Sequence, residues 1–287
     1  MQTPAIRAMH RHHPMPRKRI AHLAGRISRK LAKTIAKAQL MPLWKVHWKY
    51  KAHSMITRDS YCANIELVMT HAARLPMKDL AIVECGTWRG GMTFGMLDVV
   101  PECRHAHMFD SFEGLPVPTD RDGRQVKELF DEELFHAKRN IAGYEDVRAS
   151  ATDFGHSDRI TFHKGWFDAT VSPEAVGREI GILRVDGDWY DSTLVVLERL
   201  FDRVVPGGLI IVDDYYHWPG CSQAVHDFLS GRQAPEAIRV WRESIPYIVK
   251  LSPNHLSTPV SDEERARRIK RNKASGHKAG DTGPGST

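Results

Sequence analysis

The chain has 287 residues, 41% of them hydrophobic, which is enough for one sizeable core but too short for two full domains plus polar ends. Residues 1–58 hold 14 Lys and Arg and no Asp or Glu, so the remainder carries 27 basic against 35 acidic side chains, a net charge of −8. The acidic main body argues against a nucleic-acid partner, except through the basic N-terminal arm.

Neither a membrane span nor a secretory signal is evident. No apolar stretch reaches the roughly 18 to 20 residues that cross a bilayer, and the N-terminus lacks the apolar segment of a signal peptide. The four cysteines show no CxxC pair and no regular spacing, so they predict neither a zinc site nor a disulfide framework. We therefore expect a cytoplasmic protein.

Residues 1–58 form a basic, helical N-terminal extension in our prediction. The apolar residues recur at helical spacing and basic residues fill the other face: Ile20, Leu23, Ile27, Leu31 and Ile35 against Arg26, Arg29, Lys30, Lys33 and Lys37. Such a helix can dock on the domain or on a second subunit of a homo-oligomer. It can also contact an anionic membrane through residues 20–40, or resemble a transit peptide.

The main domain is expected over residues 59–255, where apolar runs alternate with helix-like segments. Helices are predicted over 91–100, 190–203 and 221–230, with Asp191 or Ser192 available to cap the second. Strands are predicted over 80–86, 105–112, 159–167, 181–188, 209–216 and 239–251. The alternation predicts an α/β, Rossmann-like fold: a doubly wound, mostly parallel sheet. Residues 256–287 are charged and then Gly/Ser-rich, which predicts a disordered polar tail.

A glycine-rich turn, "ECGTWRGG", follows the first strand. A strand, such a turn and a helix allow backbone N–H groups to approach a ligand, so Glu84, Gly86, Thr87 and Gly90 are candidate cofactor contacts. The spacing is not the GxGxxG of dinucleotide-binding proteins. A tight turn without a ligand is the alternative.

The second strand ends at Asp110, followed by Ser111. An acid at this position commonly holds a ribose diol, because one carboxylate accepts both hydroxyl hydrogen bonds. Asp110 therefore indicates an adenosine-containing cofactor, Ser111 is a further candidate contact, and Trp166 in "HKGWF" is a candidate for packing against the adenine. An ordinary turn carboxylate is the alternative for Asp110.

Two further strands end in carboxylates, at Asp186 and at the adjacent Asp213 and Asp214. Carboxyl ends of parallel strands share one edge of a sheet, so these groups would repel one another unless a cation neutralised them. Magnesium prefers such oxygen ligands. The alternative is that they cap helices or bind backbone amides, which we expect of Asp188 and Asp191.

Five blocks in order, "VECGTWRGG", "FDSFEGLP", "HKGWFDAT", "LRVDGDWYDST" and "IIVDDYYHWPGCSQAVHDF", resemble the macrocin O-methyltransferase family of class I S-adenosylmethionine (SAM) enzymes. The resemblance covers residues 82–228. It implies SAM, Mg²⁺, and methylation of a hydroxyl, typically on a sugar of a natural product.

Methyl transfer to oxygen requires an oriented hydroxyl that loses its proton. On this reading Asp186 is catalytic through the metal that holds the acceptor. The family's histidine base matches no position of this chain. His217 is our candidate, and His226 and His163 are alternatives.

Two other functions stay open. An NAD-dependent oxidoreductase is disfavoured by the missing GxGxxG and by the three strand-end aspartates. A membrane- or nucleic-acid-tethered binding protein would act through the basic arm alone.

Overall fold

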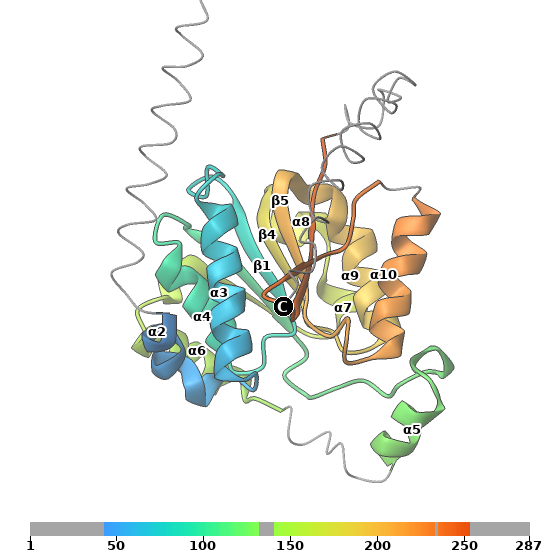
Figure 1. Ribbon diagram of the computed structural model, residues 1–287. Helices are drawn as coiled ribbons and strands as arrows, with labels where there is room; N and C mark the ends of the chain where they lie inside the picture. Colours follow the sequence, from blue (N-terminus) through green and yellow to red (C-terminus); the bar gives the residue numbers. More distant parts are fainter. Residues whose placement is uncertain (1–42, 132–140, 233–234, 253–287) are drawn as a thin grey trace, which may run out of the picture.

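The computed structural model describes residues 43–131, 141–232 and 235–252 (Figure 1). Seven strands form one sheet in the order β3-β2-β1-β4-β5-β7-β6, and only the pairings of β7 with β5 and with β6 are antiparallel. The strands are β1 Ala81–Cys85, β2 His105–Asp110, β3 Ile160–Lys164, β4 Ile180–Val185, β5 Val204–Val212, β6 Arg239–Trp241 and β7 Ile245–Val249. The predicted Rossmann-like α/β fold is confirmed.

Helices cover both faces of the sheet. The α-helices are α2 Leu43–Tyr50, α3 Arg58–Ala72, α4 Gly91–Val99, α5 Arg124–Asp131, α6 Tyr144–Asp153, α7 Phe167–Thr170, α8 Pro173–Val176, α9 Tyr190–Leu200 and α10 Pro219–Gly231. The 3₁₀ turns are η1 Lys51–His53, η2 Asp120–Asp122, η3 Ser157–Arg159 and η4 Phe201–Arg203.

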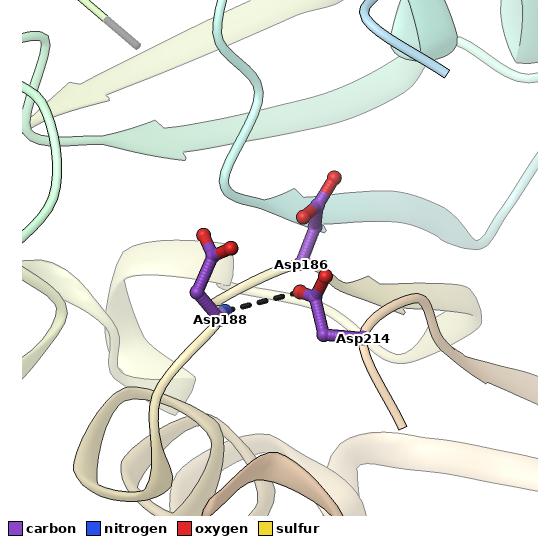
Figure 2. Close-up of side chains that lie close together, drawn as sticks. All are labelled: Asp186, Asp188 and Asp214. Carbon is purple, nitrogen blue, oxygen red and sulfur yellow. Dashed lines mark hydrogen bonds between the residues drawn. The ribbon is translucent and has the colours of Figure 1, made fainter. Parts of the chain in front are cut away.

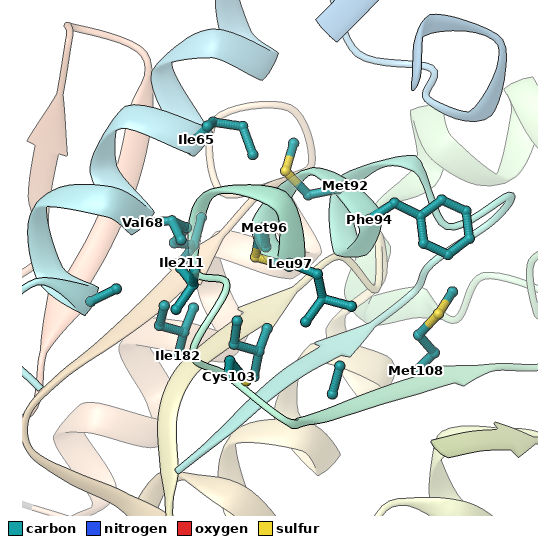
Figure 3. Packing of buried hydrophobic residues seen from close by; sticks show 14 of the residues in the cluster. Ile65, Val68, Met92, Phe94, Met96, Leu97, Cys103, Met108, Ile182 and Ile211 are labelled. Carbon is teal, nitrogen blue, oxygen red and sulfur yellow. The ribbon is translucent and has the colours of Figure 1, made fainter. Parts of the chain in front are cut away.

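Side chains that alternate along each strand supply two separate cores. Along β4, Ile182 packs with α3 and α4, whereas Leu183 packs with α9 and α10. Figure 3 shows the first of these cores, in which Ile182 and Ile211 from the sheet meet Leu97 of α4. Both faces of the central strands are buried, which explains their nearly continuous apolar sequences.

The last predicted strand, 239–251, is wrong as a single element. It is a hairpin of β6 and β7, whose turn places Arg242 and Glu243 at positive φ, 48° and 61°. The predicted strand 209–216 is β5, which begins earlier, at Val204, and ends at Val212, so the aspartates that follow it lie in a turn. Sequence pattern alone does not show a turn that contains no glycine or proline.

Residues 43–57, assigned above to the N-terminal extension, pack on the domain. Helix α2 buries Val46 and Tyr50, and the Tyr50 hydroxyl donates to Asp98 of α4 at 2.9 Å. The amphipathic stripe at residues 20–37 and the predicted tail at 256–287 lie outside the described residues. Within the described part of the chain, no helix is both long and apolar enough to cross a membrane. All four cysteines are free thiols.

Candidate active site

A cavity of about 760 Å³ opens at the carboxyl ends of the parallel strands. Its walls include the glycine-rich turn after β1, residues 110–119 after β2, the turn after β4, and Asp213 and Asp214 after β5, together with residues 53–56, residues 166–168 and part of α9. This is the edge where open α/β sheets bind ligands, beside the point at which the strand order reverses between β1 and β4. Most of the predicted site residues therefore line one space, but Gly90 and His217 do not.

The glycine-rich turn lies directly against the turn after β4. Gly86 has φ +89°, and a Cβ at this position would lie 1.7 Å from the carbonyl oxygen of Asp186. Only glycine allows both this backbone conformation and this close approach. Gly86 therefore brings the predicted cofactor loop to the first strand-end aspartate.

Asp110 holds the same turn from the other side. Its Oδ2 accepts hydrogen bonds from the backbone N–H groups of Thr87 and Trp88, both at 2.8 Å, and its Oδ1 accepts from Phe112 N–H at 2.7 Å. Burial raises the pKa of Asp110, and these amides oppose that rise. The predicted ribose contact stays a prediction. What the structure adds is a second function of Asp110, fixing the glycine-rich turn.

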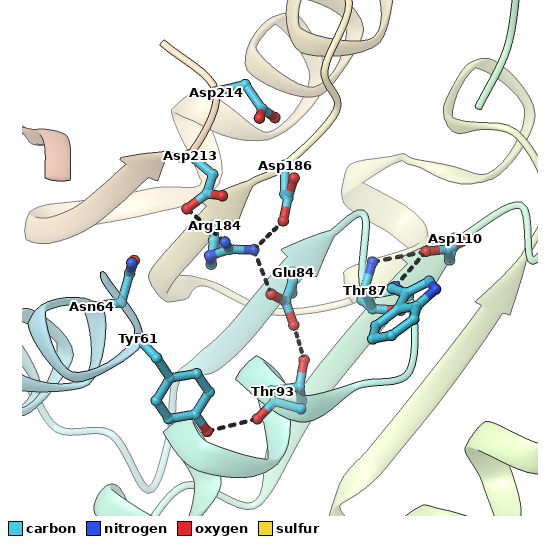
Figure 4. A network of polar contacts seen from close by, with 12 residues as sticks. Tyr61, Asn64, Glu84, Thr87, Thr93, Asp110, Arg184, Asp186, Asp213 and Asp214 are labelled. Atoms are coloured by element: carbon cyan, nitrogen blue, oxygen red, sulfur yellow. Dashed lines mark hydrogen bonds and ion pairs between the residues drawn. The ribbon is translucent and has the colours of Figure 1, made fainter. Parts of the chain in front are cut away.

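Arg184 of β4 is a buried cation that links three carboxylates (Figure 4). Its guanidinium lies 2.8 Å from Glu84, 2.6 Å from Asp186 and 2.6 Å from Asp213. Glu84 also accepts a hydrogen bond from Thr93. Burial raises the pKa of Glu84 to about 7, and the charge of Arg184 opposes that rise.

Arg184 was not among the residues predicted from the sequence. Its signal was an arginine inside the apolar run "GILRV", where a charged side chain is almost never buried unless it is paired. Glu84, predicted as a cofactor contact, borders the cavity but is only 1% exposed and is bonded to Arg184 and Thr93. Glu84 therefore stabilises the buried network that lies under the cavity.

Three carboxylates lie close together at this edge of the sheet (Figure 2). Asp186, Asp188 and Asp214 each offer one oxygen, and these oxygens all lie within 4.8 Å of one another. Burial and the neighbouring carboxylates raise the pKa of Asp214 well above its usual value and that of Asp188 to about 7. Such a group of oxygens suits a hard divalent cation, which would relieve their repulsion.

This grouping differs from the predicted metal set, Asp186, Asp213 and Asp214. Asp213 turns its Oδ1 to Arg184, whereas Asp188, expected to be a cap or loop ligand, joins the cluster. Asp188 has φ +56°, an uncommon conformation for a residue other than glycine, and its N–H donates to Asp214 Oδ2 at 3.0 Å. The geometry favours Asp188 over Asp213 as an oxygen donor.

Two tryptophans fix the turn that carries Asp188. Trp218 Nε1–H donates to Asp188 Oδ1 at 3.0 Å, and Trp189 Nε1–H donates to the Pro116 carbonyl at 2.8 Å. The two indoles contact edge to face, with ring centroids 5.4 Å apart. These hydrogen bonds tie residues 114–119, one wall of the cavity, to the carboxylate cluster.

The start of α9 differs from its prediction. Its N-cap residue is Trp189, and neither Asp191 nor Ser192 caps it. Instead, Asp122 Oδ1 accepts from the Tyr190 N–H at 2.7 Å across 68 positions of sequence. A carboxylate that is distant in the sequence thus caps the start of α9, in place of the local residue that was expected to do so.

The remaining predicted residues differ in their positions. Ser111 and Trp166 both line the cavity, and Trp166 is 40% exposed. His217 is exposed and is not among the residues that line the cavity. His226 contacts the Tyr215 hydroxyl at 2.9 Å, and His163 stacks on Phe109. The geometry therefore favours none of these three histidines as a base, whereas His53 lines the cavity; His217 stays a prediction.

Comparison with known proteins identifies the family of the chain. The model of the macrocin-O-methyltransferase (TylF) family matches residues 21–242. The chain belongs to this family. The match covers most of the chain, confirms the resemblance, and favours the methyltransferase prediction over the nicotinamide alternative.

Two curated relatives are similar over about half of the chain. An 8-demethyl-8-(2,3-dimethoxy-alpha-L-rhamnosyl)-tetracenomycin-C 4'-O-methyltransferase from Streptomyces olivaceus is 37% identical over 155 residues, 51% of this chain and 57% of the relative. A mycinamicin III 3''-O-methyltransferase from Micromonospora griseorubida is 34% identical over 152 residues, 51% of this chain and 59% of the relative. The matched segments thus span less than two thirds of these relatives.

A solved structure supports the fold. The O-methyltransferase NovP superposes with a TM-score of 0.60 at 25% identity, covering 70% of this chain and 83% of that chain. The agreement places the observed fold within the architecture of class I methyltransferases.

Proposed function

We propose that the protein transfers a methyl group from SAM to a hydroxyl of a sugar on a small glycosylated product, with the help of a divalent cation. The observation that carries the proposal is the single cavity in which the glycine-rich turn and the cluster of Asp186, Asp188 and Asp214 meet. Family membership supports the reaction type, and the names of the two curated relatives support the sugar acceptor.

SAM fits the charge of the cavity. The described residues that line it include ten carboxylates but only one guanidinium, that of Arg184, and no lysine. The sulfonium and ammonium groups of SAM are cations, which such a lining attracts. We propose that Gly86, Thr87 and Gly90 shape the loop beside the cofactor, while Asp110, Ser111 and Trp166 contact its adenosine part.

A divalent cation, with Mg²⁺ as our candidate, fits the carboxylate cluster. Asp186, Asp188 and Asp214 would hold it, and Asp213 would take part indirectly, through Arg184. When bound, SAM supplies an activated methyl group and the cation supplies positive charge that lowers the pKa of the acceptor hydroxyl. The chain orients the acceptor: its oxygen is directed toward the cluster, while residues 114–119 restrict the approach from outside.

The free thiols fit our proposal of a reducing, cytoplasmic location.

Titration of the purified chain with Mn²⁺, followed by electron paramagnetic resonance, tests the cation site. We expect Asp214→Asn to lose Mn²⁺ binding while it still binds S-adenosylhomocysteine. Asp202→Asn is the control, because Asp202 pairs with Arg232 on the surface. Equal Mn²⁺ affinity of Asp214→Asn and wild type would remove the cation from the proposal, and methyl transfer that is unchanged by a chelator would do the same.

A further inference from the structure

Helix α2 exposes two tryptophans on one side. Trp44 is 54% exposed and Trp48 is 64% exposed, and a spacing of four residues places them on the same face of the helix. The opposite side of α2 buries Val46 and Tyr50 against the domain, so the helix is fixed in place (Figure 1). Large aromatic side chains that stay exposed together on an anchored helix indicate a contact surface.

A lysine lies beside each of these tryptophans. Lys51 Nζ lies 3.5 Å from the centroid of the Trp48 ring, and Lys45 Nζ lies 5.7 Å from that of Trp44. Both lysines are exposed. We call Trp44, Lys45, Trp48 and Lys51 the α2 surface. Tryptophan beside lysine is the combination that suits the boundary between water and lipid, where the indole lies at the level of the headgroups and the ammonium meets their phosphates.

The charge of residues 1–42 favours one kind of partner for the α2 surface. The 42 residues that precede α2 contain ten Lys and Arg and no Asp or Glu. They share the sign of the α2 surface, so charge opposes their binding to it. A second copy related by a twofold axis would likewise bring one basic patch against another. An anionic surface is the partner that both the α2 surface and this segment attract.

We propose that the α2 surface docks the protein on anionic lipid bilayers, with Trp44 and Trp48 inserted at the headgroup level. The chain that follows α2 leads directly into the cavity, whose lining includes His53 to Ile56. Met55 in this segment is 56% exposed as well as cavity-lining. Docking through α2 therefore brings one wall of the cavity close to the membrane, where acceptors with a lipid or another apolar portion are concentrated.

The test is sedimentation of the full chain with vesicles of phosphatidylcholine alone or with about one third phosphatidylglycerol. We expect binding to the anionic vesicles that weakens as salt rises. The double variant Trp44→Ala/Trp48→Ala should bind at least about tenfold more weakly, because it loses the apolar contact area of two indoles. Tyr216→Ala is the matched control, since Tyr216 is 57% exposed and lies after β5, far from α2 in the sequence. It should bind like wild type.

Tryptophan fluorescence in vesicles with brominated lipids distinguishes insertion from attraction by the N-terminal segment alone. Quenching in the wild type that is lost in the double variant supports the proposal. Equal vesicle binding by wild type and double variant overturns it. So does a wild-type dimer that dissociates in the double variant without any vesicle binding, because a second copy would then cover the α2 surface. Unchanged S-adenosylhomocysteine affinity of the double variant would show that it is folded and that its defect lies outside the active site.

Discussion

Replacing Arg184 by methionine tests the buried charge network most sharply. The change removes the only cation that contacts Glu84, Asp186 and Asp213 among the described residues, yet keeps most of the side-chain volume. Loss of one partner from a buried ion pair costs about 3 to 5 kcal/mol, because the other charge stays buried without compensation. For a domain of this size each kcal/mol lowers the melting temperature by roughly 2 to 4 °C, so we expect a fall of about 6 to 20 °C.

The pKa of Glu84 determines how the stability loss of Arg184→Met depends on pH. The pKa of Glu84 is about 7 in the folded protein, above its usual value of 4.5, so its contribution to stability is full below pH 4.5 and is lost as the pH rises through 7. Without Arg184 that pKa rises further. The stability deficit of Arg184→Met relative to wild type should therefore grow as the pH rises through this range.

The coupling energy between Arg184 and Glu84 is measured by thermal and urea unfolding of four proteins: wild type, Arg184→Met, Glu84→Gln and the double variant. We expect Glu84→Gln to cost less than Arg184→Met, because Arg184 keeps two carboxylates. The double variant should recover part of the loss, since one uncompensated charge has been removed. Two results would refute this reasoning. One is a melting temperature of Arg184→Met within the error of wild type. The other is a double variant that is destabilised by more than the sum of the two single variants.

Three further substitutions separate the functions of neighbouring groups. Asp110→Ala should weaken binding of S-adenosylhomocysteine by about 1 to 3 kcal/mol in a calorimetric titration, and unchanged affinity would remove Asp110 from the cofactor site. Trp218→Phe removes the hydrogen bond to Asp188 but keeps an aromatic ring, so Mn²⁺ affinity should fall by about tenfold while cofactor affinity holds; an unaltered Mn²⁺ titration would contradict the positioning function of Trp218. Asp122→Ala should lower the free energy of unfolding in urea by about 1 to 2 kcal/mol because it exposes the first N–H of α9, and full stability would show that water caps the helix equally well.

The fold was largely predictable because burial on both faces leaves a clear pattern in the strands. Apolar runs such as "LAIVECG" are long enough to identify β1, and the alternation with helices indicates a parallel sheet. The edge that bears the cavity follows from the direction of the strands. Asp186 and Asp214 could therefore be assigned to one site without any knowledge of their distance.

Side-chain partners were less predictable because they depend on long-range geometry. Asp213 and Asp214 are adjacent in sequence, yet one turns to Arg184 and the other joins the carboxylate cluster. The sequence contains no signal for that difference. Asp122 caps a helix 68 positions away, a contact that exists only after the loop after β2 has packed against the turn after β4.

The most direct test of the proposed function is a calorimetric titration of the purified chain with S-adenosylhomocysteine, beside a titration with NAD, both in magnesium buffer. We predict micromolar binding of S-adenosylhomocysteine and none of NAD. Binding of NAD alone, or of neither ligand, would contradict the proposal that this cavity serves SAM-dependent methyl transfer.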